Sequence, residues 1–154
     1  MNMNVVSFLN GAVVFRAPAD WQQSHDDART IVLFQTEPTP ITLRLTVVAS
    51  MLPAHVREAS AQGLMRLASG QPENVVEELS HDRALKQFTT RGGSAERPTF
   101  VQFWHFGIRG TGLRWMQAVF SLTVDEADMS LPAVEEITKI LDAEIRQATF
   151  DPEK

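Results

Sequence analysis

The alternation of apolar and polar residues predicts β-strands through most of the first fifty residues. They are expected at about residues 4–9, 12–16, 30–35 and 41–49. In the last of these, every second residue from Ile41 to Ala49 is apolar, a period of two that is typical of a half-buried strand. Asn10-Gly11 favours a tight type I′ hairpin turn between the first two strands. The polar stretch 22–29 predicts a loop or a short helical turn.

The period changes at Pro53, which suits the first turn of a helix. Apolar and small residues then recur at spacings of three and four, which predicts a helix at about 53–69 with Gly70 as its C-terminal stop. Further strands are expected at about 75–81, 85–91, 100–106 and 113–124. A closing helix begins near Pro132, and its apolar stripe consists of Val134, Ile137, Leu141, Ile145 and Ala148.

This order of elements predicts an α+β fold, with a mostly antiparallel β-sheet of six to eight strands sandwiched by two main helices. The 154 residues are one domain's length, and no internal repeat or linker divides them. We therefore expect a single domain over residues 1–154. Apolar residues make up 44% and charged residues 21%, which argues against disorder, collagen and coiled coil.

Charge and composition exclude several classes of partner and of chemistry. The net charge of −5 and the pI of about 5.3 argue against a nucleic-acid partner. The chain has no cysteine, which excludes disulfides, thiolate nucleophiles and cysteine-based zinc sites. The N-terminal residues lack the basic leader and long apolar run of a secretory signal, and no apolar stretch is long enough to span a bilayer. We expect a cytoplasmic protein without membrane insertion.

The search for catalytic chemistry yields no catalytic residue, no metal ligand and no cofactor. No two of the four histidines have the i, i+4 spacing of a helical metal site. His105 lies in the aromatic strand; a satisfied, partly buried histidine is the favoured interpretation, and a general base is the alternative. The glycines at 107–112 lead into a strand rather than a helix, the wrong geometry for a phosphate loop.

Aromatic residues give the one signal for a binding site. Strand 100–106 carries large apolar groups on both faces, which is typical of a central, covered strand. Trp104, Phe106 and Trp115 are expected to line one sheet face near the turn at 107–112. Two interpretations stay open: a core covered by helices, or an apolar groove for a partner segment. The partner-binding hypothesis names Trp104, Phe106, Trp115 and Val119.

The layout also resembles a known family. The N-terminal hairpin followed by Phe15-Arg16-Ala17-Pro18-Ala19-Asp20-Trp21 is similar to the opening of PsbP-like domains. The aromatic hairpin over 99–124 and the closing helix ending in Ala148-Thr149-Phe150 resemble their C-terminal half. The resemblance implies a central antiparallel sheet between helices and non-enzymatic work. Members of this fold include a photosystem II subunit, a Ran-binding import factor, DcrB-like envelope proteins and Eag chaperones.

The leading hypothesis is a cytosolic, bacterial protein-binding module that resembles an Eag-type chaperone or adaptor for a type VI secretion effector, acting as a homodimer. Its partner would be a protein with apolar helices. The alternative is an immunity or inhibitor protein, whose acidic surface would bind a basic toxin. A small hydrolase that uses His105 is the third hypothesis.

Overall fold

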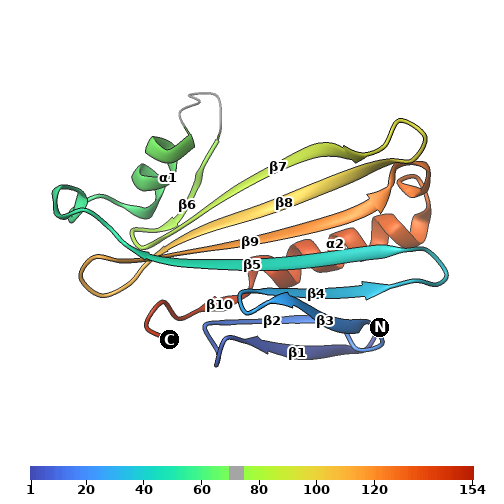
Figure 1. The fold of residues 1–154 in the computed structure, drawn as a ribbon, viewed down its shortest axis with the longest axis horizontal. Helices are drawn as coiled ribbons and strands as arrows, with labels where there is room; N and C mark the ends of the chain where they lie inside the picture. The colour runs from blue at the N-terminus through green and yellow to red at the C-terminus, as the bar shows by residue number, and fades with distance from the viewer. Residues whose placement is uncertain (70–74) are drawn as a thin grey trace.

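The computed structural model describes residues 1–69 and 75–154. Within these residues the chain forms ten strands, two α-helices and two 3-10 turns (Figure 1). The strands are β1 (Met3–Phe8), β2 (Val13–Pro18), β3 (Gln22–Asp27), β4 (Thr30–Gln35), β5 (Ile41–Met51), β6 (Glu77–Ser80), β7 (Arg83–Gly93), β8 (Pro98–Arg109), β9 (Arg114–Asp125) and β10 (Thr149–Phe150). The helices are α1 (Ala61–Ser69) and α2 (Pro132–Arg146), and the 3-10 turns are η1 (Ala54–Val56) and η2 (Glu126–Asp128).

The strands form two antiparallel sheets. The larger has seven strands in the order β3-β4-β5-β9-β8-β7-β6, and the smaller has three in the order β1-β2-β10. Long strands β5, β9, β8 and β7 make the centre of the larger sheet, because each neighbouring pair runs antiparallel over nearly its whole length. The predicted α+β class and the mostly antiparallel sheet are confirmed.

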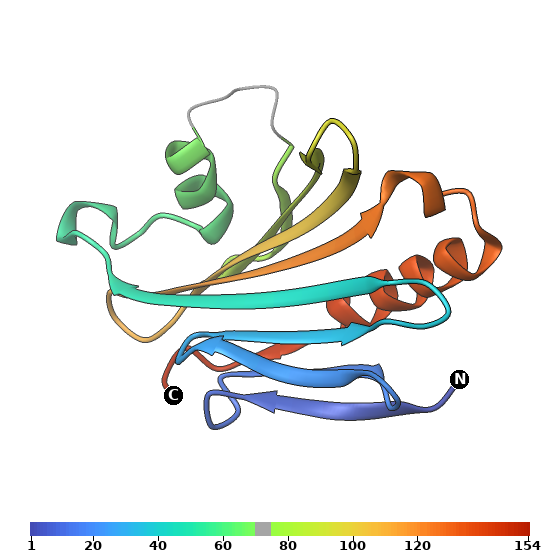
Figure 2. The same ribbon diagram turned by 45° about the vertical axis from the view of Figure 1, so that its right-hand side comes forward.

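One face of the seven-stranded sheet, here called the inner face, bears the main hydrophobic core. Helix α2 and the three-stranded sheet pack on it (Figures 1 and 2). Phe15 of β2 meets Phe120 of β9 edge to face, with ring centroids 5.2 Å apart. Leu141 and Ile145 of α2 are fully buried, as their place in the predicted apolar stripe requires. Burial of this apolar surface is the main force that holds the layers together.

The opposite face, here called the outer face, is covered only in part by the described elements. Helix α1 lies over one end of the long strands, on the side away from α2 (Figure 2). It forms a second, smaller core with the sheet, made of Ala61, Leu64, Met65, Val76, Ala84 and Trp115. The outer face beyond α1 therefore presents half-buried side chains, while the inner face is closed.

Two sequence expectations about strands are wrong. The predicted single sheet of six to eight strands is a seven-stranded sheet with a separate three-stranded sheet beside it, and the polar stretch at 22–29 contains strand β3 instead of a loop or helical turn. All six residues of β3 are exposed, and the strand is held by backbone pairing with β4. An edge strand that buries neither face shows no apolar alternation, so the pattern could not reveal it.

The predicted helix at 53–69 is also interrupted. It consists of η1 and α1, separated by residues 57–60. The buried guanidinium of Arg109 donates hydrogen bonds to the carbonyl oxygens of Val56, at 3.3 Å, and Ala59. A continuous helix would use these carbonyls internally. Ser60 Oγ instead accepts from the backbone N–H of Gly63 at 3.0 Å and caps α1. The proposed stop at Gly70 lies outside the described residues.

The first hairpin forms, but its turn differs from the expected one. Phe8 pairs with Val13, so the loop has four residues rather than two. Leu9, Asn10 and Gly11 all have positive φ angles, of 53°, 56° and 87°. Asparagine and glycine tolerate this conformation well, which explains why the pair marks the hairpin although the type I′ turn is not formed.

Candidate functional site

The structure separates the four residues of the partner-binding hypothesis onto two faces. Trp104 and Phe106 of β8 lie on the inner face and have no exposed surface. Trp115 and Val119 of β9 lie on the outer face. They pair with Arg109 and His105 of β8, which are an odd number of residues away from Trp104 and so point to the opposite side of the sheet. The expected aromatic face shared by Trp104, Phe106 and Trp115 is therefore not formed. The register set by the turn decides this, since side chains alternate strictly along each strand.

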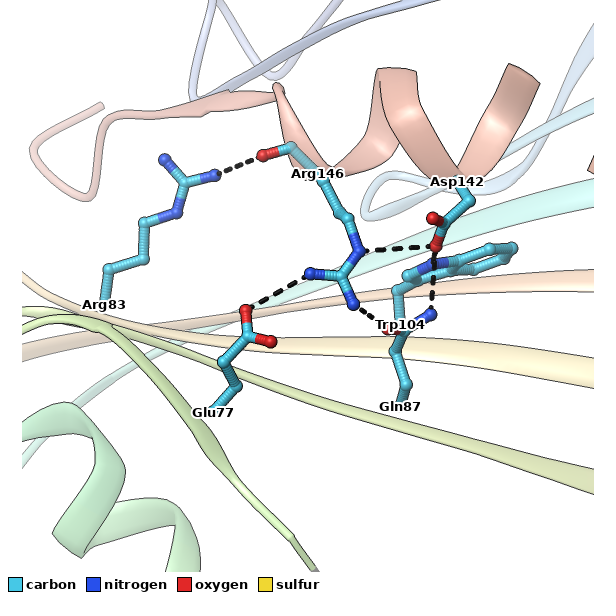
Figure 3. A network of polar contacts seen from close by, with 6 residues as sticks. All are labelled: Glu77, Arg83, Gln87, Trp104, Asp142 and Arg146. Atoms are coloured by element: carbon cyan, nitrogen blue, oxygen red, sulfur yellow. Dashed lines mark hydrogen bonds and ion pairs between the residues drawn. The ribbon is translucent and has the colours of Figure 1, made fainter. Parts of the chain in front are cut away.

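Trp104 serves as a link between the sheet and α2 (Figure 3). Its indole Nε1 donates a hydrogen bond of 2.9 Å to Asp142 Oδ1 of α2. The same oxygen accepts from Gln87 Nε2 at 3.1 Å and lies 3.4 Å from Arg146 Nε. A buried indole N–H needs such a partner. In this conformation Trp104 holds α2 in place and offers no surface to a partner.

The same network closes the C-terminal end of α2 (Figure 3). Arg146 reaches Glu77 of edge strand β6 at 3.2 Å and also contacts Gln87. Arg83 Nη2 donates to the carbonyl oxygens of Ala148, at 2.8 Å, and Arg146, at 3.4 Å. A cation at these carbonyls complements the negative end of the helix dipole. The cluster thus connects the C-terminal end of α2 to β6 and β7, and this structural role accounts for its charged residues.

A pocket of about 140 Å³ lies between α1 and the outer face, here called the α1 pocket. Its apolar walls come from α1 and from Trp115 of β9. Three polar side chains, one from each of the neighbouring strands β7, β8 and β9, also line it. The lining residues are Leu64, Met65, Ala68, Lys86, His105, Trp115 and Gln117. Apolar walls with a few converging polar groups are typical of ligand sites.

A larger hollow of about 490 Å³ opens beside Trp21 and shares no lining residue with the α1 pocket. The indole Nε1 of Trp21 is already bonded to Gln35 Oε1 at 3.0 Å. The α1 pocket is smaller but brings a cation, an imidazole and an amide together. It is therefore the better candidate for binding chemistry.

Gly107 makes the floor of the α1 pocket possible. A Cβ atom at this position would lie 2.5 Å from the Trp115 ring and 2.8 Å from Met65 Sδ. Real atoms do not approach so closely, so the indole and the helix can sit against the strand only because residue 107 has no side chain. The sequence pattern indicated a turn at Gly107, but this glycine belongs to strand β8.

His105 is half-buried, and its ring Nε2 lies 2.8 Å from Gln117 Oε1. Burial lowers the pKa of His105, the hydrogen bond to Gln117 raises it, and the positive charge of Lys86 lowers it. The net result is a pKa below the ordinary value of 6.5. None of the described residues that line the pocket is acidic, so this part of the chain offers no carboxylate to orient His105 as a general base.

The lowered pKa predicts a specific loss of stability in acid. As the pH falls through about 6.5, the unfolded chain binds a proton on His105 before the folded chain does. The contribution of His105 is complete above this range and declines as the pH falls toward the lower folded pKa. Wild type should therefore lose more unfolding free energy between about pH 7.5 and about pH 5.5 than His105→Gln. Urea titrations at both pH values measure the difference; an identical loss in the two proteins would contradict it.

Beyond the α1 pocket, the outer face carries an apolar strip. This strip, here called the outer strip, consists of Val48, Phe88, Val101, Phe103 and Val119, which the strand register places on the same face and which are all at least partly exposed. Phe88 and Phe103 stack with ring centroids 4.7 Å apart, and Val48 is 47% exposed. Val119 was among the residues predicted from the sequence to bind a partner. Phe88 was not, although the same alternation along β7 marks it.

The described residues contain neither a cluster of metal ligands nor a membrane-spanning helix. No three histidine, aspartate or glutamate side chains come close enough together to hold a metal ion in residues 1–69 and 75–154. In the same part of the chain, neither α-helix is long and apolar enough to cross a membrane.

Comparison with known proteins supports the fold but assigns no family. No protein-family model matches the chain, and no curated protein matches its sequence. A solved chain from Bacteroides thetaiotaomicron aligns with a TM-score of 0.54 and 11% identity, over 82% of this chain and 43% of that one. The chain thus spans less than half the length of this neighbour.

The Saccharomyces cerevisiae Ran-binding protein Mog1p aligns along almost its entire length. The TM-score is 0.55 and the identity 13%, over 97% of this chain and 95% of Mog1p. A point mutant of Mog1 gives a TM-score of 0.53 and 12% identity, over 97% and 96% of the two chains. At these identities the comparison shows a shared α+β fold.

Proposed function

We propose that the chain is a non-enzymatic protein-binding module that holds an apolar segment of its partner on the outer strip. The observation that carries this proposal is the asymmetry of the large sheet. Its inner face is closed by α2 and the small sheet, whereas the outer strip keeps apolar side chains partly in water. Partly exposed apolar surface of this kind is typical of protein-binding sites.

The partner we propose is a type VI secretion effector with apolar helices, for which the chain acts as a cytoplasmic chaperone or adaptor of the Eag type. Two features support the coarser part of this proposal, the binding of an apolar segment of a protein. The outer strip offers the apolar surface that such a helix needs to leave water, and a neighbour with the same fold, Mog1p, is a Ran-binding protein. Because residues from four adjacent strands form the strip, a helix lying across the strands can contact all of them.

A second candidate is an inhibitor or immunity protein that binds a basic toxin. The net charge of −5 favours it. The two candidates differ in salt dependence, because charge complementarity is screened by salt whereas apolar burial is not. Binding that persists at high salt supports the apolar segment, and binding that falls steeply with salt supports the toxin.

The proposal predicts that Val119→Asp weakens partner binding by about tenfold or more, since a carboxylate would have to be buried against an apolar segment. The matched control is Val5→Asp, at a valine that is 68% exposed on β1 of the small sheet. Val48→Asp, at a second position of the outer strip, keeps the test open if Val119→Asp disturbs the fold. Thermal unfolding followed by circular dichroism checks each variant.

A photo-crosslinking amino acid at position 119, and at position 5 as control, identifies the partner in native cells without detergent. A specific adduct at position 119 with a protein that carries apolar helices supports the proposal. An adduct with a second copy of the chain would assign the outer strip to a homodimer instead. Equal labelling from both positions, or binding unaffected by Val119→Asp and Val48→Asp, would contradict it.

A further inference from the structure

The α1 pocket combines features that a flat protein-binding surface does not need. Three polar side chains converge at one end, and Leu64, Met65 and Trp115 provide apolar walls at the other. The volume of about 140 Å³ is close to that of a cavity that holds benzene in another protein, about 150 Å³. The pocket therefore suits a hydrocarbon group of about six carbon atoms.

The polar end has a definite charge preference. Lys86 is the cation of the lining and is the direct cross-strand neighbour of His105 on the outer face. Its ammonium lies 5.1 Å from the centroid of the Phe88 ring, and no ion pair joins it to a carboxylate within the described residues. An anionic group at this end would gain a charge-assisted hydrogen bond from Lys86.

We propose that the α1 pocket binds a small apolar carboxylate, with its hydrocarbon part between α1 and Trp115 and its carboxylate at Lys86, next to the His105 ring. The ligand class is that of short fatty acids and aryl carboxylic acids. Gln117 completes the site, because its amide lies 2.8 Å from the His105 ring and fixes the orientation of the imidazole. This inference goes beyond the proposed function and does not depend on a protein partner.

The test titrates hexanoate and its neutral analogue hexan-1-ol into the intact chain. Binding is followed by NMR through the Trp115 indole and His105 ring signals. Hexanoate is expected to give saturable shifts of both signals and to bind more tightly than hexan-1-ol. Ala68→Trp, at an exposed position of α1 that lines the pocket, should block both probes by filling the space.

Lys86→Met should weaken hexanoate binding by about tenfold or more, the scale of a lost hydrogen bond to a charged group. It should leave hexan-1-ol binding nearly unchanged. Lys139→Met makes the same substitution at an exposed position of α2 and should change neither. Lys86→Gln keeps a polar side chain and serves as the second variant if methionine alters the fold.

Three results would overturn the inference. Hexanoate could give no saturable shift up to about 10 mM, beyond the affinity expected for a fragment of this size. Hexan-1-ol could bind as tightly as hexanoate, or both Lys86 variants could bind hexanoate like wild type. None of these results bears on the outer strip, so failure here is distinguishable from failure of the proposed protein binding.

Discussion

Replacing Trp104 with alanine is expected to destabilise the domain by about 3–5 kcal/mol, the usual cost of removing a buried aromatic side chain. Trp104 has no exposed surface and lies between the sheet and α2. The substitution leaves a cavity in the main core and removes the donor at 2.9 Å from Asp142 Oδ1. Urea unfolding followed by far-UV circular dichroism measures the change.

Trp104→Phe separates the packing from the hydrogen bond. Phenylalanine keeps most of the ring volume but lacks the N–H group, so its loss should be smaller, about 1–3 kcal/mol. A loss below about 1 kcal/mol for Trp104→Ala would contradict the packing seen between β8 and α2. If Trp104→Ala destabilises the chain as expected, reduced partner binding by this variant reflects unfolding rather than a lost contact.

Gly107→Ala is expected to destabilise the chain by about 1–3 kcal/mol, the range for an overpacked core. The added Cβ would meet the Trp115 ring at 2.5 Å and Met65 Sδ at 2.8 Å. The indole and α1 must both move away from β8, which opens the smaller core. Urea unfolding gives the free energy, and hydrogen exchange of the α1 amides shows whether the helix is the part that loosens.

The control is Gly63→Ala, in α1 itself. Its Cβ would come no closer than 3.3 Å to a neighbouring atom, Ser60 Oγ, and alanine favours the helix over glycine by about 1 kcal/mol. Gly63→Ala should therefore cost clearly less stability than Gly107→Ala. A neutral Gly107→Ala would show that Trp115 does not lie on the strand as described.

Periodicity was a good guide wherever one face of an element is buried. The alternation from Ile41 to Ala49 predicted β5, and the stripe of Val134, Ile137, Leu141 and Ile145 predicted α2, because burial of one face imposes the period of the element. It failed at β3, whose residues are exposed on both faces. The helical period also continues across the break between η1 and α1 and so did not predict it. The side chain that interrupts the helix, Arg109, lies about fifty residues further along the chain, where a local pattern cannot register it.

The candidate site shows the same division. The sequence by itself determined the fold class, the main apolar faces and the residue types available for chemistry, since these follow from composition and local period. It singled out Trp104, Trp115, Val119 and His105 but could not place them on a common or opposite face. The turn between β8 and β9 sets the register, and a shift of one residue moves every side chain to the other face.

Only the tertiary structure could therefore decide which aromatic residues are core and which border a binding surface. It buried Trp104 against α2 and Phe106 against Phe150 of β10, and it left Val119 on the outer strip. It also brought Lys86, His105 and Gln117 from three strands into the lining of one pocket beneath α1. Their proximity is a property of strand pairing between distant segments, which no local pattern of residues encodes.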